Sequence, residues 1–503
     1  MKKFILFGFS GLLILVFATL GYGQALPKLD FRASGLMDVL SVWSKNVAEP
    51  PWNTSPVIFG PHTHLLPTGP AFDKTHAYME SRARLRFDAV MGKELQGTIY
   101  FEVDSLRWGE VAGTGAQRNQ AGQWGADRAA VEVKNAFITF AVPVIPIPMQ
   151  VHAGILPFAF RSGYLLYNDG AGIQTEIKVD PVGIRLVWGK MMENQDWAAD
   201  DDDVYGVDVN AKIGKLTVGG FGLNYNMNTY PVDLPTAVFP GTSTVDFKAN
   251  FWWLGLYADG RVGPVDINFD LGYDTGKVED SRNIAPRARD VKYSGWLTRL
   301  KVDYPWEKFN FGLIGMYSSG ADTRKTSATG LPGELTSSGV TSSRVGGWVV
   351  PPWSEHGYGD SVVFYPIDFV RSTPGFSHSP ATTVAGGYYG GSWFAKLYGS
   401  YRVAPWYKVT LAALYIGDTT QHGNSIGNAR KAPFGASNLR DDKTIGWEFN
   451  LRNDFQIYKN LTWWAAGGAL LPGDAMDYFN SSTRTNVSPK IPWAVVTKLT
   501  YVF

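Results

Sequence analysis

Apolar and polar residues alternate with a period of two in many short segments along the whole chain. The clearest segments are 94–108, 263–275 and 443–457, where apolar side chains at every second position oppose Gln, Thr, Asp, Asn, Glu and Arg. One apolar face with a period of two is typical of a half-buried β-strand. The pattern therefore predicts an all-β protein.

The connections between the predicted strands alternate between short and long. We expect about eighteen strands, within about 16–20, joined alternately by tight turns and long loops. The long loops are expected at 45–74, 109–128, 158–170, 191–203, 227–244, 276–289, 319–383, 418–442 and 472–489. A soluble sandwich has the same alternation of side chains but not this order of connections. The sequence predicts a single transmembrane antiparallel β-barrel, closed because hydrocarbon leaves no partner for an open sheet edge.

The first residues have the pattern of a secretory signal peptide. Met1-Lys2-Lys3 is basic, 4–20 is uncharged and mostly apolar, and Gly21-Tyr22-Gly23 supplies small residues before a cleavage site. The alternative is an uncleaved membrane anchor, since the apolar stretch is at the lower limit for spanning a bilayer. We expect a signal peptide at 1–23 and one barrel at 24–503.

The last predicted strand, 491–503, alternates apolar and polar residues and ends on Phe503. This ending resembles the last strand of Gram-negative outer-membrane barrel proteins, and the strand number resembles the porins of sixteen to eighteen strands. The resemblance implies a barrel in outer-membrane lipid with both termini in the periplasm. It also implies a homotrimer and passive diffusion of small hydrophilic solutes or ions through a water-filled channel.

Composition narrows the possible partners. The formal net charge is +1, which argues against nucleic acid, and 56 glycines with 14% aromatic residues suit one large barrel. The chain has no cysteine, so lipidation at cysteine, disulfides, thiolate metal sites and covalent c-type haem are excluded. We predict no cofactor.

Charged residues on the polar face of the strands are expected to line the pore. The set is Arg82, Arg84, Arg86, Glu102, Asp104, Asp266, Asp270, Arg299, Glu448 and Arg452. The three arginines share one strand face at a spacing of about 6.7 Å. They either form a basic row that passes anions, as the resemblance to substrate-specific porins implies, or pair with Glu102 and Asp104 and brace the wall.

Two long loops are candidates for narrowing the channel. The third external loop folds inward in many porins, and by position it contains Arg161, Tyr164, Tyr167 and Asp169. An ordinary external loop is the alternative. The longest loop, 319–383, is rich in Gly, Ser, Thr and Pro, and a loop of this length is usually functional or disordered. It could enter the mouth as a gate or present a binding surface.

Signals for catalysis and metal binding are weak. Asp200, Asp201, Asp202 and Asp203 are a candidate calcium cluster, although a solvated acidic loop is the alternative. His62 and His64 lack a third ligand at useful spacing, and no nucleophile elbow or phosphate-binding loop has the required context. The sequence therefore predicts no enzyme. A diffusion porin is expected, with a sheath for a partner such as an electron-transfer cytochrome, or an adhesive surface barrel, as alternatives.

Overall fold

The computed structural model describes most of the strands and part of the loops. The described residues are 28–46, 75–104, 108, 131–143, 146–161, 165–193, 200–228, 247–280, 290–322, 324, 344–351, 360–365, 390–435 and 438–503, without the side chains of His76, Asp104, Phe247, Asp280 and Val291. The predicted signal peptide at 1–23 lies outside these ranges, as do His62, His64 and Tyr164. No helix among the described residues is long and apolar enough to cross a membrane.

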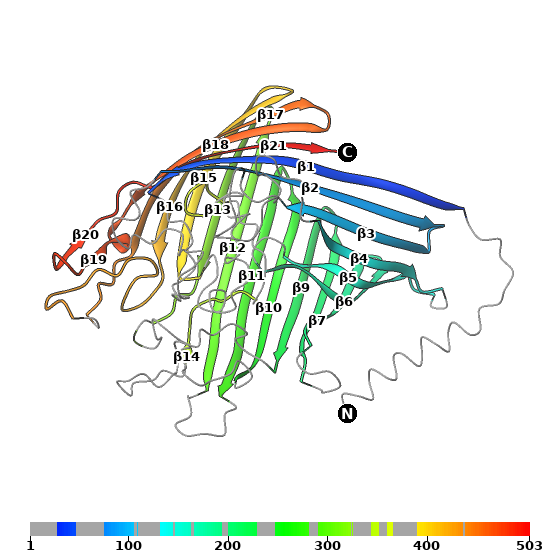
Figure 1. Ribbon diagram of the computed structural model, residues 1–503, viewed down its shortest axis with the longest axis horizontal. Helices are drawn as coiled ribbons and strands as arrows, with labels where there is room; N and C mark the ends of the chain where they lie inside the picture. Colours follow the sequence, from blue (N-terminus) through cyan, green and yellow to red (C-terminus); the bar gives the residue numbers. More distant parts are fainter. Residues whose placement is uncertain are drawn as a thin grey trace, which may run out of the picture.

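Eighteen antiparallel strands close into one barrel, as the alternation predicts. They are β1 (Leu29–Lys45), β2 (Thr75–Met91), β3 (Leu95–Asp104), β4 (Glu132–Ala141), β5 (Met149–Phe160), β6 (Leu166–Val179), β7 (Val182–Met192), β8 (Asp202–Ile213), β9 (Leu216–Met227), β10 (Phe247–Val262), β11 (Val265–Asp280), β12 (Val291–Trp306), β13 (Phe309–Ser318), β15 (Ser392–Ala404), β16 (Tyr407–Asp418), β17 (Thr444–Tyr458), β18 (Leu461–Pro472) and β21 (Trp493–Val502). Each pairs with the next, and β21 pairs with β1, so blue meets red at the seam in Figure 1.

Among the residues that the structure describes, four small elements lie outside this ring. β14 (Arg344–Val345) pairs in parallel with the long-loop end of β12, and β19 (Tyr478–Asn480) forms a hairpin with β20 (Thr485–Val487). The short 3₁₀ helix η4 (Asp474–Met476) precedes that hairpin. All four belong to connections predicted to be long loops, and the sequence pattern did not predict them.

Short and long connections lie at opposite ends of the barrel, since successive strands run in opposite directions. The prediction of a long loop at 158–170 is wrong. β5 and β6 extend into this range and leave only 161–165 between them. Phe158 and Phe160 continue the alternation of β5 and pair in register with Asn168 and Leu166. Pro157 and the glycines of β6 obscured this pattern in the sequence.

The wall has an apolar outside and a polar inside, the reverse of a soluble protein. Leu397 and Leu411, on neighbouring strands, are 65% and 62% exposed, whereas Glu448 and Asp274 are 0% exposed. Large apolar side chains are exposed on strands all around the barrel, whereas a soluble protein confines such exposure to a limited patch. Such a surface is compatible with hydrocarbon as its solvent.

Outward-facing aromatic rings, exposed or half-buried, lie near both ends of the strands. Near the short turns, Tyr407 stacks on Phe455 at 4.6 Å between ring centroids. Near the long loops, Trp296 stacks on Tyr317 at 4.7 Å. Two such bands are typical of barrels that span a bilayer.

Two aromatic residues of β10, Trp253 and Tyr257, point inward and do not belong to these bands. Trp253 donates its indole N–H to the carbonyl of Val349, and Tyr257 donates its hydroxyl to Asp208. The stretch 251–254 is apolar at every position, so its alternation could not tell the two faces apart.

The seam between β1 and β21 is closely packed. Gly35 exchanges two backbone hydrogen bonds with Phe503, at 2.8 and 3.0 Å. A Cβ added to Gly35 would lie 2.4 Å from the carbonyl oxygen of Arg84 and 2.8 Å from the Phe503 ring. The seam therefore has no room for a side chain at position 35.

Gly35→Ala is expected to weaken the closed barrel, because overpacking of this kind costs about 1–3 kcal/mol. Gly97→Ala is the matched control, since nothing lies within 4 Å of its added Cβ. Thermal unfolding followed by the electrophoretic shift of the folded barrel measures the difference. Equal melting temperatures for the two variants would contradict the packing account of the seam.

Candidate functional site

Charged side chains on the inner face of β2, β3, β4 and β6 form one continuous ion-pair network. Glu102 binds Arg82 at 2.7 Å, Arg84 at 2.9 Å and Lys134 at 3.2 Å. Lys134 also binds Asp169 at 2.6 Å. Arg84 lies directly opposite Glu102 in the register and binds it through both Nε and Nη2, so this pair is bidentate.

The arginine row is therefore paired along its length. Arg86 binds Asp88 on its own strand at 2.9 Å, and that carboxylate also accepts hydrogen bonds from Thr98 and Gln96. Asp104 lies opposite Arg82 in the strand register, and its side chain is not described. These contacts match the wall-bracing alternative for the row.

Arg161, at the end of β5, contacts the inner wall five strands away. Its guanidinium binds Asp259 of β10, at 3.0 Å between Nη2 and Oδ1, and Asp270 of β11 through Nε. It also lies 4.3 Å from the ring centroid of Tyr257. The backbone of Arg161 has a φ of +42°, a conformation that costs about 1–3 kcal/mol for a residue other than glycine. The end of β5 at Arg161 is thus held against the inner wall.

The other two described residues of the predicted third loop belong to β6. Tyr167 and Asp169 pair with Ala159 and Pro157 of β5, so the prediction that they lie in a loop is wrong. Asp169 faces inward, where Asn135 donates to it at 2.7 Å.

Part of the longest loop, the 344–351 segment, lies on the inner wall at β10, β11 and β12. The carboxylate of Asp274 accepts hydrogen bonds from the backbone N–H of Val349 at 3.1 Å and of Gly295 at 2.9 Å. Trp348 is buried, and a Cβ added to Gly272 would lie 2.8 Å from its ring. The missing side chain at position 272 leaves the space that Trp348 occupies.

A second part of the same loop, the 360–365 segment, is held by Glu448 on the inner face of β17. Oε1 of Glu448 accepts from the backbone N–H of Val362 at 2.9 Å and of Val363 at 2.8 Å. Oε2 accepts from the N–H of Phe364 and from the hydroxyl of Ser361, both at 2.9 Å. Successive backbone N–H groups that converge on one carboxylate form an anion-binding nest.

The flanks of this segment are also attached to the wall. Tyr365 contacts Ser392 through their hydroxyl groups at 2.9 Å, and its ring packs on Phe394 at 4.9 Å. Asp360 binds Arg299 at 2.8 Å. A Cβ on Gly468 would lie 2.7 Å from that of Val362, so the segment approaches β18 where the wall has no side chain.

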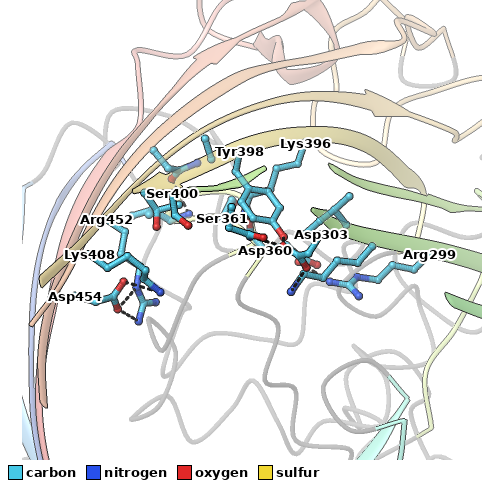
Figure 2. A pocket seen from close by; sticks show the side chains of 17 residues that line it. Arg299, Asp303, Asp360, Ser361, Lys396, Tyr398, Ser400, Lys408, Arg452 and Asp454 are labelled. Carbon is cyan, nitrogen blue, oxygen red and sulfur yellow. Dashed lines mark hydrogen bonds and ion pairs between the residues drawn. The ribbon is translucent and has the colours of Figure 1, made fainter. Parts of the chain in front are cut away.

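A polar cavity of about 360 Å³ lies between this segment and the inner wall of β12, β13, β15, β16 and β17. Figure 2 shows charged groups on two sides of it, with Asp454 near Lys408 and Arg452 on one side and Asp360 near Arg299 on the other. The cationic side chains that line the cavity are Arg299, Lys301, Lys396, Lys408 and Arg452, and the anionic ones are Asp303, Asp360 and Asp454. The lining therefore carries more positive than negative charge.

Of these lining residues, the sequence analysis singled out Arg299 and Arg452 for the pore and missed Lys408 and Lys396. Both lysines occupy polar positions of predicted strands, so the alternation of apolar and polar residues could have identified them as pore-lining. Asp360 lies in the longest loop, where no alternation marks it.

Asp266, predicted to line the pore, lies beside the β10–β11 turn. It binds Arg261 through two hydrogen bonds of 2.6 Å, and both side chains are largely exposed. This pair braces the rim of the barrel.

The candidate calcium residues contact protein groups. Asp202 accepts from the backbone N–H of Asn228 at 2.6 Å, Asp201 binds Lys190 at 3.2 Å, and Asp203 accepts from Trp188 at 3.1 Å. No group of three His, Asp or Glu side chains in the described ranges is arranged to hold a metal ion. The calcium hypothesis gains no support from this arrangement.

At the long-loop end, Asp322 joins two connections. His422 of the neighbouring connection lies 3.0 Å away, and the backbone N–H of Arg324 donates to the carboxylate at 3.0 Å. Burial alone would raise the pKa of Asp322, but the hydrogen bonds of Arg324 and the charge of His422 lower it below its usual value.

Glu102→Gln is expected to destabilise the barrel by about 3–5 kcal/mol, because Arg82, Arg84 and Lys134 lose their shared buried partner. Asp266→Asn removes the same charge from an exposed pair and is expected to change stability little. Urea unfolding in detergent compares the two. A Glu102→Gln barrel as stable as the Asp266→Asn barrel would contradict the role of Glu102 as the centre of the network.

The chain has distant structural likenesses among solved structures. No protein-family profile and no curated protein matches the sequence. Among solved structures, OccK11 (OpdR) of Pseudomonas aeruginosa aligns with 96% of this chain and 99% of its own, at 10% identity and a TM-score of 0.48. OpdO of Pseudomonas aeruginosa aligns with 95% of this chain and 98% of its own, at 10% identity and a TM-score of 0.48. OmpT, an outer membrane protein of Vibrio cholerae in a trimer form, aligns with 95% of this chain and 100% of its own, at 9% identity and a TM-score of 0.39.

Proposed function

We propose that the protein is an outer-membrane porin, through which small hydrophilic solutes or ions diffuse passively along a water-filled lumen. The observation that carries the proposal is a closed barrel with an apolar outside and a charged cavity on its inner wall. A closed barrel satisfies its backbone groups in hydrocarbon, and its inner charges require water or ionic partners.

The segments inside the barrel favour a channel over a sheath for another protein. The 344–351 and 360–365 segments occupy inner wall at β10–β12 and at β17–β18. They reduce the room for a folded partner, whereas a small solute needs only a narrow path. Arg161, at the end of β5, narrows the lumen from another side, and we propose it as part of the constriction.

The cavity is the proposed origin of ion preference. Its lining carries five cationic and three anionic side chains, while the arginine row is already paired with Glu102 and Asp88. A lumen with excess positive charge concentrates anions. We therefore propose a preference for anions over cations.

Purified protein in a planar bilayer is expected to give single channels with ohmic conductance. If the pure protein gives no channels, the porin proposal fails. Stable co-purification with a cytochrome in that case would favour the sheath. The mass of the detergent-solubilised particle tests the proposed homotrimer separately.

The double variant Lys301→Gln, Lys408→Gln is expected to shift the reversal potential in a salt gradient toward cation preference, because both lysines line the cavity. The matched control is Lys215→Gln, Lys459→Gln, which removes two charges from the short turns outside the lumen. An equal shift in both double variants, or none in either, would contradict the cavity as the origin of selectivity.

A further inference from the structure

We propose that Glu448 positions the 360–365 segment in the lumen and thereby sets the size limit of the channel. The inference rests on the proposed function, and it names the residue and the loop segment that set the width of the proposed channel. Glu448 is a positioning residue, since it acts through the segment that it holds.

The geometry of the contact makes Glu448 the main attachment of the segment. Four donors from four consecutive residues, 361–364, converge on the two oxygens of one buried carboxylate. Hydrogen bonds to a charged acceptor are about twice as strong as neutral ones. The donors are three backbone N–H groups and one hydroxyl. The N–H of Val362 has a second acceptor in Asn450 Oδ1 at 3.0 Å, and the other three donors would be buried and unsatisfied without the carboxylate.

The 360–365 segment lies inside the barrel, where it can restrict the passage of solutes. Glu448 and Asn450 alternate with outward-facing Trp447 and Phe449 along β17, so the carboxylate points into the barrel. Val362 accordingly lies above the inner face of β18 at Gly468. Residues 360–362 also line the charged cavity, and Figure 2 labels Asp360 and Ser361 there.

Positioning of the segment also sets part of the charge in the lumen. It places the Asp360 carboxylate 2.8 Å from Arg299, and the Asp360 carbonyl accepts from Lys396. If the segment is released, Arg299 loses the Asp360 carboxylate and Lys396 loses the Asp360 carbonyl. The lumen then becomes both wider and more positive.

Glu448→Gln is the decisive substitution because it keeps the shape of the side chain. A glutamine has one oxygen and one NH₂ group, so two of the four donors would face another donor. The control is Glu176→Gln, which removes the same charge from β6, where Glu176 pairs with Lys178 and not with the segment.

Two measurements test the proposal. In planar bilayers, neutral polyethylene glycols of graded size are added to the bath, and the largest polymer that still enters the channel is determined. For Glu448→Gln this limit is expected to shift to larger polymers, with higher conductance, whereas Glu176→Gln should keep the wild-type limit. A limit that is unchanged in Glu448→Gln, while the wild type conducts, overturns the inference and leaves the porin proposal intact.

The second measurement does not depend on conduction. The chain has no cysteine, so Val362→Cys introduces a single thiol at a buried position. A water-soluble maleimide is expected to react slowly with this thiol in the folded barrel and much faster when Glu448→Gln is added. Equal labelling rates in folded protein would overturn the positioning role, even if the wild type forms no channels.

Discussion

The closed ring of backbone hydrogen bonds between strands is the constraint on which the rest of the structure depends. Eighteen strands complete this ring only because β21 pairs with β1, where Gly35 lets Phe503 approach the chain closely. Once the ring is closed, a period of two sends alternate side chains outward and inward. The apolar exterior and the charged interior therefore follow from the same ladder.

The buried carboxylates of the interior need cationic or hydrogen-bonding partners, and the protein supplies these partners in two ways. In one part of the wall, carboxylates pair with cations on the wall itself, as Glu102 does with Arg82 and Arg84. In another part, Asp274 and Glu448 bind backbone N–H groups of the longest loop. The second arrangement holds segments of the longest loop inside the lumen. Inward-facing carboxylates therefore stabilise the wall in one place and narrow the channel in another.

The features that could be predicted from the sequence are those that depend on the local alternation of apolar and polar residues. Alternation within each strand predicted the barrel, its strand number and the inward direction of Glu448, because each depends on neighbouring residues alone. It failed at 158–170, where Pro157 and glycines hid the strand, and it cannot assign the two faces at 251–254, where every residue is apolar. The contact of Arg161 with Asp259 and Asp270 joins residues about a hundred positions apart, which no local pattern records. The attachment of 361–364 to Glu448 uses mainly backbone donors, and every sequence has these.

The most direct test of the account is an experimental structure of the protein in lipid nanodiscs. The account predicts density for residues 361–364 inside the barrel, in hydrogen-bond contact with Glu448, beside a solvent-filled cavity lined by Arg299 and Arg452. An open lumen with this segment outside the barrel would contradict it, as would a partner or loop filling the cavity completely.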